Sequence, residues 1–325
     1  MFHSSEEILI KEECETDPRY GCEPGKRPIE EYISKGIINL DKPSGPTSHQ
    51  VVSWIKDMLE VKKAGHSGTL DPKVTGVLPV AIEESTKILQ ALLTADKEYI
   101  TLMHLHKDIS LEKLEEVLEY FKGEIYQTPP LKSSVKKCLR IKRVYSIDVL
   151  ETEGRWVLMK VSCESGTYIR KLCHDIGLVL GSGAHMQDLR RTRVGPFTEN
   201  SSVKLHDVKD AYEFWKEDKE EKYLREVILP LEKGVEHLKK IWVKDSAVDA
   251  ICHGANLTAR GVSKLNSGIE MDELIAIMTL KNELIALAKA LRTSEEILNM
   301  DKGIVADLER VIMKRGTYPK KWSSK

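Results

Sequence analysis

The sequence lacks the marks of several large classes of protein. Its six cysteines form no C-x-x-C pair and no secretory leader precedes them, so we expect reduced thiols in a cytosolic, cytoplasmic protein. No apolar run approaches the roughly 18 residues that a membrane span requires, so we expect no membrane contact. The cysteines are Cys14, Cys22, Cys138, Cys163, Cys173 and Cys252.

Two common motifs of enzymes are also missing. Gly177, Gly181 and Gly183 lack the G-x-G-x-x-G spacing and follow an expected helix instead of opening one, which excludes a dinucleotide-binding loop. Residues 65–68, GHSG, lack the G-x-S-x-G spacing of a hydrolase nucleophile. His104 and His106 could chelate a metal from one strand face, but no further ligands stand at zinc spacing, so we expect no metal site.

A large excess of charge of either sign is absent as well. The net charge of the 325 residues is -1, and a 41% hydrophobic content is enough to bury a full core, in what we expect to be two domains. The charges are unevenly distributed: residues 132–143 hold six basic side chains and no acidic one, whereas residues 206–226 hold eight acidic and five basic ones. This segregation favours an electropositive face for phosphates, although ordinary solvated faces would give the same pattern.

Local patterns predict a mixture of strands and helices. Thr47 and Gln50 have the spacing of a capping box, and the apolar residues that follow repeat at helical intervals, so a helix begins here. Ser110 is expected to cap a second helix. Further helices are expected at residues 86–93, 167–180 and 245–252, and strands at residues 36–40, 97–106, 144–150, 156–163, 273–280, 284–290 and 304–314.

Residues 65–80, GHSGTLDPKVTGVLPV, surround a single carboxylate, Asp71, with glycine and proline. Glycine permits backbone conformations that are closed to other residues and proline fixes its neighbours, so such a loop has a defined shape. An acid held in a shaped loop is a candidate reactive group. The alternative is a turn in which the aspartate only caps the backbone.

This loop resembles the catalytic motif of the TruB family of pseudouridine synthases, and with INLDKPSGPTSHQVV before it and SGTYIRKLCHDIG after it the match covers most of residues 36–200. The pattern is most similar to archaeal homologues of dyskerin, the catalytic subunit of box H/ACA ribonucleoproteins. The resemblance implies an α+β protein that has a pseudouridine synthase fold, with a mixed, mostly antiparallel sheet flanked by helices, and a C-terminal PUA β-barrel. The expected domains are an N-terminal extension packing on the PUA domain (1–35), the catalytic domain (36–235), the RNA-binding PUA domain (236–318) and a basic tail (319–325).

The resemblance assigns catalytic roles to Asp71, Tyr99 and Arg170. Asp71 matches the family's essential aspartate, Tyr99 its base-stacking tyrosine, and Arg170 the arginine that pairs with the aspartate; a core aromatic and a surface arginine are the alternatives for the last two. A cation in the first turn of a helix is unfavourable, so a counter-ion at Arg170 is expected on that ground too. The resemblance also implies substrate-binding roles for His66, which helps to displace the uridine, Leu189, which lines the base pocket, and Lys42, for which we favour a structural role beside the site.

The implied reaction detaches uracil from its sugar, rotates it and rejoins it through carbon, with no redox change and no cofactor. Asp71 would act as a nucleophile or as a base, and must stay ionised while sheltered from water. An arginine partner favours the ionised form. The target base must be held out of its stack, which calls for a flat side chain and an apolar wall.

The implied substrate is rRNA, and possibly tRNA, modified under the direction of a box H/ACA guide RNA. The implied partner proteins are a small zinc-binding protein, a small β-barrel protein and a kink-turn-binding protein. A stand-alone tRNA pseudouridine synthase and a non-catalytic scaffold for ribosome assembly are the alternatives. Because the sequence lacks the lysine-rich tail of eukaryotic dyskerins, we expect an archaeal, cytoplasmic setting.

The expected RNA contacts lie in three places. The resemblance implies a basic thumb loop before residue 143, a pair of arginines after the helix at 167–180, and a PUA surface that grips the ACA trinucleotide of the guide. The residues are Lys132, Lys136 and Lys137 in the loop, Arg190 and Arg191 after the helix, and His253, Gly254, Ala255 and Lys320 in the PUA region.

Overall fold

The computed structural model describes residues 7–129 and 138–320. They form two compact units, one containing Ile38–Val80 and Leu92–Val227 and the other the described residues of Met1–Ile37, Ala81–Ala91 and Ile228–Lys325. We refer to them as the 38–227 unit and the terminal unit. Within the described ranges, no helix has the length and the apolar character needed to cross a membrane.

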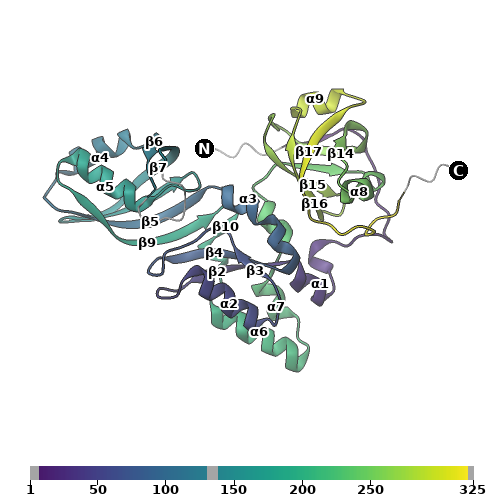
Figure 1. Ribbon diagram of the computed structural model, residues 1–325, viewed down its shortest axis with the longest axis horizontal. Helices are drawn as coiled ribbons and strands as arrows, with labels where there is room; N and C mark the ends of the chain where they lie inside the picture. Colours follow the sequence, from purple (N-terminus) through teal and green to yellow (C-terminus); the bar gives the residue numbers. More distant parts are fainter. Residues whose placement is uncertain (1–6, 130–137, 321–325) are drawn as a thin grey trace. The chain divides into compact units, whose positions relative to one another are not determined.

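The 38–227 unit is built on a mixed sheet (Figure 1). Its strands are β2 (Gly36–Lys42), β3 (Ala64–His66), β4 (Thr75–Ile82), β5 (Lys97–Leu105), β6 (Gly123–Gln127), β7 (Arg140–Glu153), β8 (Trp156–Cys163), β9 (Ala184–Val194) and β10 (Phe197–Thr198). They follow the order β2-β4-β9-β5-β8-β7-β6, with β3 on β4 and β10 on β9. β4 runs parallel to β9, whereas the pairs from β9 to β6 are antiparallel, which confirms the expected mixed, mostly antiparallel sheet.

Helices flank this sheet. They are α2 (Ser48–Met58), α4 (Leu111–Tyr120), α5 (Ile169–Leu180), α6 (Leu205–Asp218) and α7 (Lys222–Val227). A further helix, α3 (Leu89–Thr94), begins in the terminal unit and ends in the 38–227 unit. The capping box of α2 is formed, since the Thr47 hydroxyl accepts from Gln50 N and the Gln50 side chain accepts from Thr47 N. Helices α4 and α5 share one buried core with the sheet, which includes Met103, Leu114, Val161, Leu172 and Ile176.

The terminal unit contains a seven-stranded sheet of order β1-β14-β12-β15-β16-β17-β13. Its elements are β1 (Ile8–Ile10), α1 (Ile29–Ser34), β11 (Leu229–Pro230), β12 (Lys240–Val243), α8 (Asp245–Cys252), β13 (Leu257–Thr258), β14 (Val262–Asn266), β15 (Leu274–Thr279), β16 (Leu284–Ala290), α9 (Ser294–Asn299) and β17 (Ile304–Val311). Strand β1 pairs antiparallel with β14, so the N-terminal segment adds an edge strand to a sheet that is otherwise formed by residues after 239.

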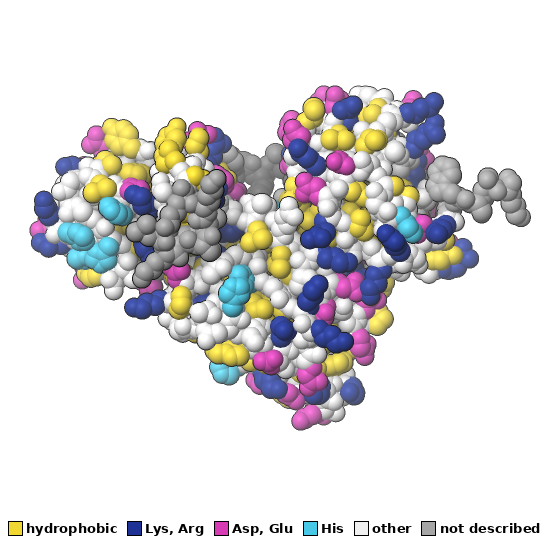
Figure 2. Space-filling view, viewed as in Figure 1, with side chains coloured by type: hydrophobic (Ala, Val, Ile, Leu, Met, Phe, Trp, Pro, Cys, Tyr) yellow, Lys and Arg dark blue, Asp and Glu magenta, His cyan; other side chains and the backbone are white. Residues whose placement is uncertain are grey.

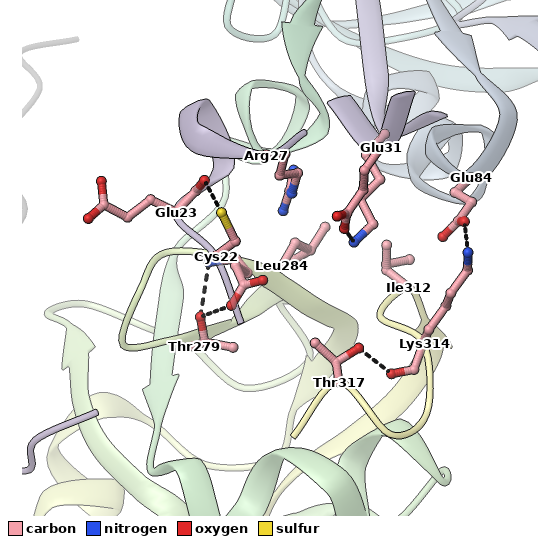
Figure 3. A network of polar contacts seen from close by, with 12 residues as sticks. Cys22, Glu23, Arg27, Glu31, Glu84, Thr279, Leu284, Ile312, Lys314 and Thr317 are labelled. Atoms are coloured by element: carbon pink, nitrogen blue, oxygen red, sulfur yellow. Dashed lines mark hydrogen bonds and ion pairs between the residues drawn. The ribbon is translucent and has the colours of Figure 1, made fainter. Parts of the chain in front are cut away.

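Ion pairs join the segments of the terminal unit that are distant in sequence. Arg27 makes two hydrogen bonds to Glu232, Nη1 to Oε2 at 2.9 Å and Nη2 to Oε1 at 2.7 Å, and both side chains are buried. Lys314 pairs with Glu84 at 2.6 Å, and Figure 3 shows this ion pair in the same view as Arg27. The terminal unit is therefore held together by long-range polar contacts as well as by its apolar core.

Most of the expected elements are present, with boundaries that differ by a few residues. The helix expected at 86–93 begins as a 3-10 turn, Glu83–Ile88, before α3. Strand β9 was not predicted, because its sequence AHMQDLRRTRV has little of the apolar alternation that indicates a strand. It lies between β4 and β5, so its position is fixed by two neighbouring strands and not by its own composition.

Candidate active site

The loop around Asp71 is held in place by hydrogen bonds from the buried side chains of Lys42 and Ser48. The buried Lys42 ammonium donates to the carbonyl oxygens of Pro43, Pro72 and Val74 at 2.9–3.0 Å. The buried Ser48 hydroxyl, at the start of α2, donates to Leu70 O and accepts from Leu70 N. Lys42 thus holds the loop in place, which agrees with the structural role that we favoured, and no part of its side chain is exposed to a substrate in the unbound protein.

Arg191 also holds this loop. Its Nε donates to Val77 O at 2.8 Å and its Nη2 donates to Gly68 O at 3.2 Å, and the residue is 2% exposed. A Cβ at Gly76, whose φ is +101°, would lie 2.2 Å from the carbonyl oxygen of Arg191, so only glycine allows β4 to approach β9 here. The expectation that Arg191 faces RNA is corrected: its guanidinium is turned inward and satisfies loop carbonyls.

Asp71 and Arg170 form the expected ion pair. Arg170 Nη2 donates to Asp71 Oδ2 at 2.6 Å, across 99 positions of sequence. Arg170 lies in the first turn of α5, so Asp71 supplies the counter-ion that this position requires. The two side chains are 58% and 61% exposed, so the shelter from water that we expected for Asp71 is not provided by the unbound protein.

A cavity of about 580 Å³ opens beside this pair. Tyr99 and Leu189 contribute to its wall from the adjacent strands β5 and β9, and both are partly buried. Burial raises the pKa of the Tyr99 hydroxyl, while the neighbouring positive charge of Arg191 opposes that shift. The lining residues are Gly68, Thr69, Leu70, Asp71, Val74, Leu93, Lys97, Tyr99, Ser165, Gly166, Thr167, Tyr168, Ile169, Arg170, Met186, Leu189 and Arg191.

Lys97 is a cavity residue that the sequence reasoning missed. Its ammonium donates to the carbonyl oxygens of Leu92, Leu93 and Ala95 and to the Ser165 hydroxyl, at 2.6–3.2 Å. Burial lowers its pKa to about 8. A lysine two positions before Tyr99 on one strand face was the available signal, since alternate residues of a strand point the same way.

His66 lies on β3, at the start of the loop, and is not among the cavity residues. Its ring packs against that of His49 on α2, with centroids 5.0 Å apart. Burial, together with the charges of His49 and Arg191, lowers the pKa of His66 to about 4. His66 is therefore neutral at physiological pH, and its expected part in displacing uridine stays a prediction.

The expected RNA contacts differ in their surroundings. Arg190 is ion-paired with Asp41 and Glu199, so a phosphate would compete with two carboxylates for it. His253, Gly254, Ala255 and Lys320 are exposed, and Gly254 has a φ of +94°, as suits a turn that presents its backbone. Lys132, Lys136 and Lys137 lie outside the described residues.

Four family models match the chain. The model described as the TruB family pseudouridylate synthase N-terminal domain matches residues 56–169, and that of the tRNA pseudouridylate synthase B C-terminal domain matches residues 170–236. A DKCLD (NUC011) domain matches residues 2–52 and a PUA domain residues 239–312. The last of these confirms the expected C-terminal PUA domain, and with it the α+β fold.

The chain is similar along its whole length to curated proteins and to solved structures. It is 60% identical to the probable tRNA pseudouridine synthase B of Methanopyrus kandleri, over 100% of this chain and 96% of that protein, and 60% identical to that of Pyrococcus horikoshii, over 97% and 95%. A crystal structure of a Cbf5-Nop10-Gar1 complex contains a chain that is 58% identical, with a TM-score of 0.94 and coverage of 98% and 97%. A structure of an H/ACA RNP bound to a substrate RNA containing 2'-deoxyuridine contains one that is 56% identical, with a TM-score of 0.92 and coverage of 98% of both chains.

Proposed function

This chain belongs to the TruB family of pseudouridine synthases, isomerases that act on RNA, and from that premise we propose that it modifies specific uridines of rRNA, and of tRNA, as the catalytic subunit of a box H/ACA guide-directed ribonucleoprotein. In this proposal Asp71 is the reacting carboxylate, Arg170 its charge partner, and Tyr99 and Leu189 the walls for the flipped base. The free cysteines suit a reducing compartment, and the cytoplasm is the setting we propose.

The observation that carries the proposal is the Asp71–Arg170 pair at the cavity formed by β5, β9 and the loop. An ionised carboxylate with a guanidinium partner can attack the sugar or remove a proton while the base leaves. Tyr99 supplies a ring for stacking, and its raised pKa keeps the hydroxyl neutral. A single base needs only such a flat face and an apolar wall to be held outside its stack.

The exposure of the pair has a consequence for substrate binding. Because Asp71 is 58% exposed, the described residues of the unbound protein do not exclude water from it, and in this proposal the bound RNA contributes to that exclusion. If the substrate RNA itself closes the site, contacts outside the cavity have to position the target nucleotide before it reacts. This supports a mechanism in which a guide RNA and the PUA domain place the target.

The guide-directed function is supported by the chains of similar structure, which occur in a Cbf5-Nop10-Gar1 complex and in an H/ACA RNP. We propose proteins of the Nop10 and Gar1 kinds as the zinc-binding and β-barrel partners that the sequence resemblance implied, and a kink-turn-binding protein as the third. The curated relatives favour a second candidate, because they are named as probable tRNA pseudouridine synthases. A stand-alone activity on tRNA would need no guide.

The two candidates differ in their dependence on guide RNA. Uridine labelled with tritium at C5 releases its label when C5 becomes bonded to the sugar, so label release measures turnover. We expect the chain, combined with its partner proteins, to release label from an rRNA fragment only when an H/ACA guide complementary to it is added. Equal release from a tRNA transcript by the chain alone would favour the stand-alone function, and release lost in Asp71→Asn would assign either activity to this site.

A further inference from the structure

Three histidines lie together at the end of the catalytic sheet where β5 ends and β9 begins. His104 and His106 belong to the β5 end and His185 to β9, and His104 is the cross-strand partner of His185. One ring nitrogen of each lies within 4.8 Å of the others. The space-filling view shows histidine side chains gathered at its left edge, at the β5 and β9 end of the unit in Figure 1 (Figure 2).

The nitrogens of His106 and His185 already face each other. His106 Nε2 and His185 Nδ1 are 2.9 Å apart, so one of them donates a proton to the lone pair of the other. A divalent ion can take the place of that shared proton, since it is bound by the same lone pairs. Around a tetrahedral zinc ion with bonds of ~2.0–2.1 Å, ligand nitrogens are about 3.3 Å apart. Side-chain rotations that bring a His104 nitrogen closer to the other two would therefore give three ligands at this spacing.

The backbone makes room for this arrangement. His106 N donates to the carbonyl oxygen of Gly183 at 3.0 Å, and Gly183 has a φ of +71°. A Cβ at Gly183 would lie 2.8 Å from His106 Nδ1, so glycine is required for the imidazole to lie where it does. On the other side, the Trp156 ring packs on His104 with centroids 4.2 Å apart. Both rings are therefore positioned by neighbours.

The charges nearby leave the three imidazoles available. Arg155 is a cation that acts on His104, and its guanidinium is bound to Asp108 through two hydrogen bonds of 2.8 and 3.2 Å. Its charge is thus offset, and Asp108 is already engaged. The fourth position of a three-histidine site is open to water or to a ligand from another molecule, as in catalytic zinc sites.

We propose that His104, His106 and His185 form a binding site for a borderline divalent transition-metal ion such as Zn²⁺, which joins the end of β5 to the start of β9. Imidazole nitrogens select this class of ion over Mg²⁺ and Ca²⁺, which prefer oxygen. Only two of the three ligands were visible as a sequence pattern, because the third comes from 79 positions away. The site would join the two strands that carry Tyr99 and Leu189, at the end of β5 opposite to Tyr99.

Titration of the full-length, tag-free protein with Co²⁺ tests the site, since cobalt in a site with few ligands absorbs strongly in the visible range. We expect one equivalent to bind with such a band and to quench fluorescence from Trp156, whose ring touches His104, and Zn²⁺ to displace the cobalt. The quenching should disappear in Trp156→Phe while the absorption band stays. Quenching that persists in this variant would mean that the ion lies elsewhere.

Matched histidine variants decide the ligands. His185→Gln and His106→Gln should each weaken Co²⁺ binding at least about tenfold, whereas His174→Gln, at an exposed histidine of α5, should bind as the wild type does. Circular dichroism checks that each variant is folded. Two ligand variants are used, so that the test still stands if one of them does not fold. Binding that is unchanged in both folded variants, or a thiolate-to-cobalt absorption band that assigns the ion to cysteines, would overturn the proposal.

Discussion

Two arginine–carboxylate pairs that join distant segments, one from each unit of the molecule, are opposite in character. Arg27 and Glu232 in the terminal unit are 2% and 10% exposed and share two hydrogen bonds (Figure 3 shows Arg27). Arg170 and Asp71 in the 38–227 unit are 61% and 58% exposed and share one. The same chemical partners are therefore committed to structure in one unit and left available in the other.

The physical basis of the difference is solvation. A buried pair has lost its water, so removal of one partner leaves an uncompensated charge in a medium of low polarity. An exposed pair keeps its water and contributes little to stability, so its carboxylate can exchange a protein partner for a substrate. Exposure of Asp71 thus suits the reacting group that we propose, which has to meet RNA, and burial of Glu232 suits a contact that holds two segments together.

The largest effect is expected from Asp71→Asn. The change removes the charge and nearly preserves the shape, so pseudouridine formation should fall by about 10²–10⁴-fold or more. The free energy of unfolding should change by no more than ~1 kcal/mol, because the pair is exposed. Tritium release and urea unfolding measure the two quantities, and appreciable turnover by the mutant would remove Asp71 from the chemistry.

The reverse pattern is expected from Glu232→Gln. Loss of the carboxylate leaves Arg27 buried without its counter-charge, and Glu232 Oε1 also accepts from Leu284 N, so the unfolding free energy should fall by about 3–5 kcal/mol. Activity of the molecules that remain folded at low temperature should persist. The exposed pair of Lys26 and Glu23 is the control, and Lys26→Met should cost less than ~1 kcal/mol. Similar losses in both variants would contradict the comparison.

Arg170 sharpens it. Arg170→Ala should lose most of the activity, and if the pairing were bidentate Arg170→Lys would not recover it. The structure has one Nη2 to Oδ2 bond, which a lysine ammonium can reproduce, so we expect Arg170→Lys to recover part of the turnover. A lysine variant as inactive as the alanine variant would mean that the second guanidinium nitrogen binds Asp71 or substrate during the reaction.

The sequence predicted the residues that share the cavity with Asp71 better than the buried residues that hold its loop in place. The pair with Arg170 and the sides of the cavity at Tyr99 and Leu189 were expected, because these residues match motif positions of the family that the sequence resembles. The inward position of Arg191 was not, although it is adjacent to Arg190 in the same basic cluster. Composition cannot show whether a guanidinium meets a phosphate or backbone carbonyls, since both are hydrogen-bond acceptors and only the fold decides which is near.

His66 allows a test through pH. Its pKa is lowered to about 4 in the folded protein, while the unfolded chain binds the proton near 6.5. The unfolded state therefore holds more protons between these values, so the stability from a neutral His66 is complete above pH 6.5 and is lost as the pH falls toward 4. His66→Asn should flatten this part of the stability profile measured by urea unfolding. A parallel profile for both proteins would show that His66 is not the titrating group.

The smallest effects are expected from the exposed groups of the terminal unit that we propose as RNA contacts. Lys320 and His253 are both exposed, but only the lysine carries a permanent charge that releases counter-ions from phosphate. Lys320→Ala should therefore weaken guide binding and reduce the slope of log affinity against log salt by about one, whereas His253→Ala should weaken binding with little change in slope. Replacing the ACA trinucleotide of the guide should weaken the wild type and Lys320→Ala equally, and should have less effect on His253→Ala if the turn contacts those bases. Equal sensitivity of all three proteins to the ACA change would mean that the exposed turn at His253 does not contact the trinucleotide. Exposure would then indicate a functional contact at the Asp71–Arg170 pair but not at this turn.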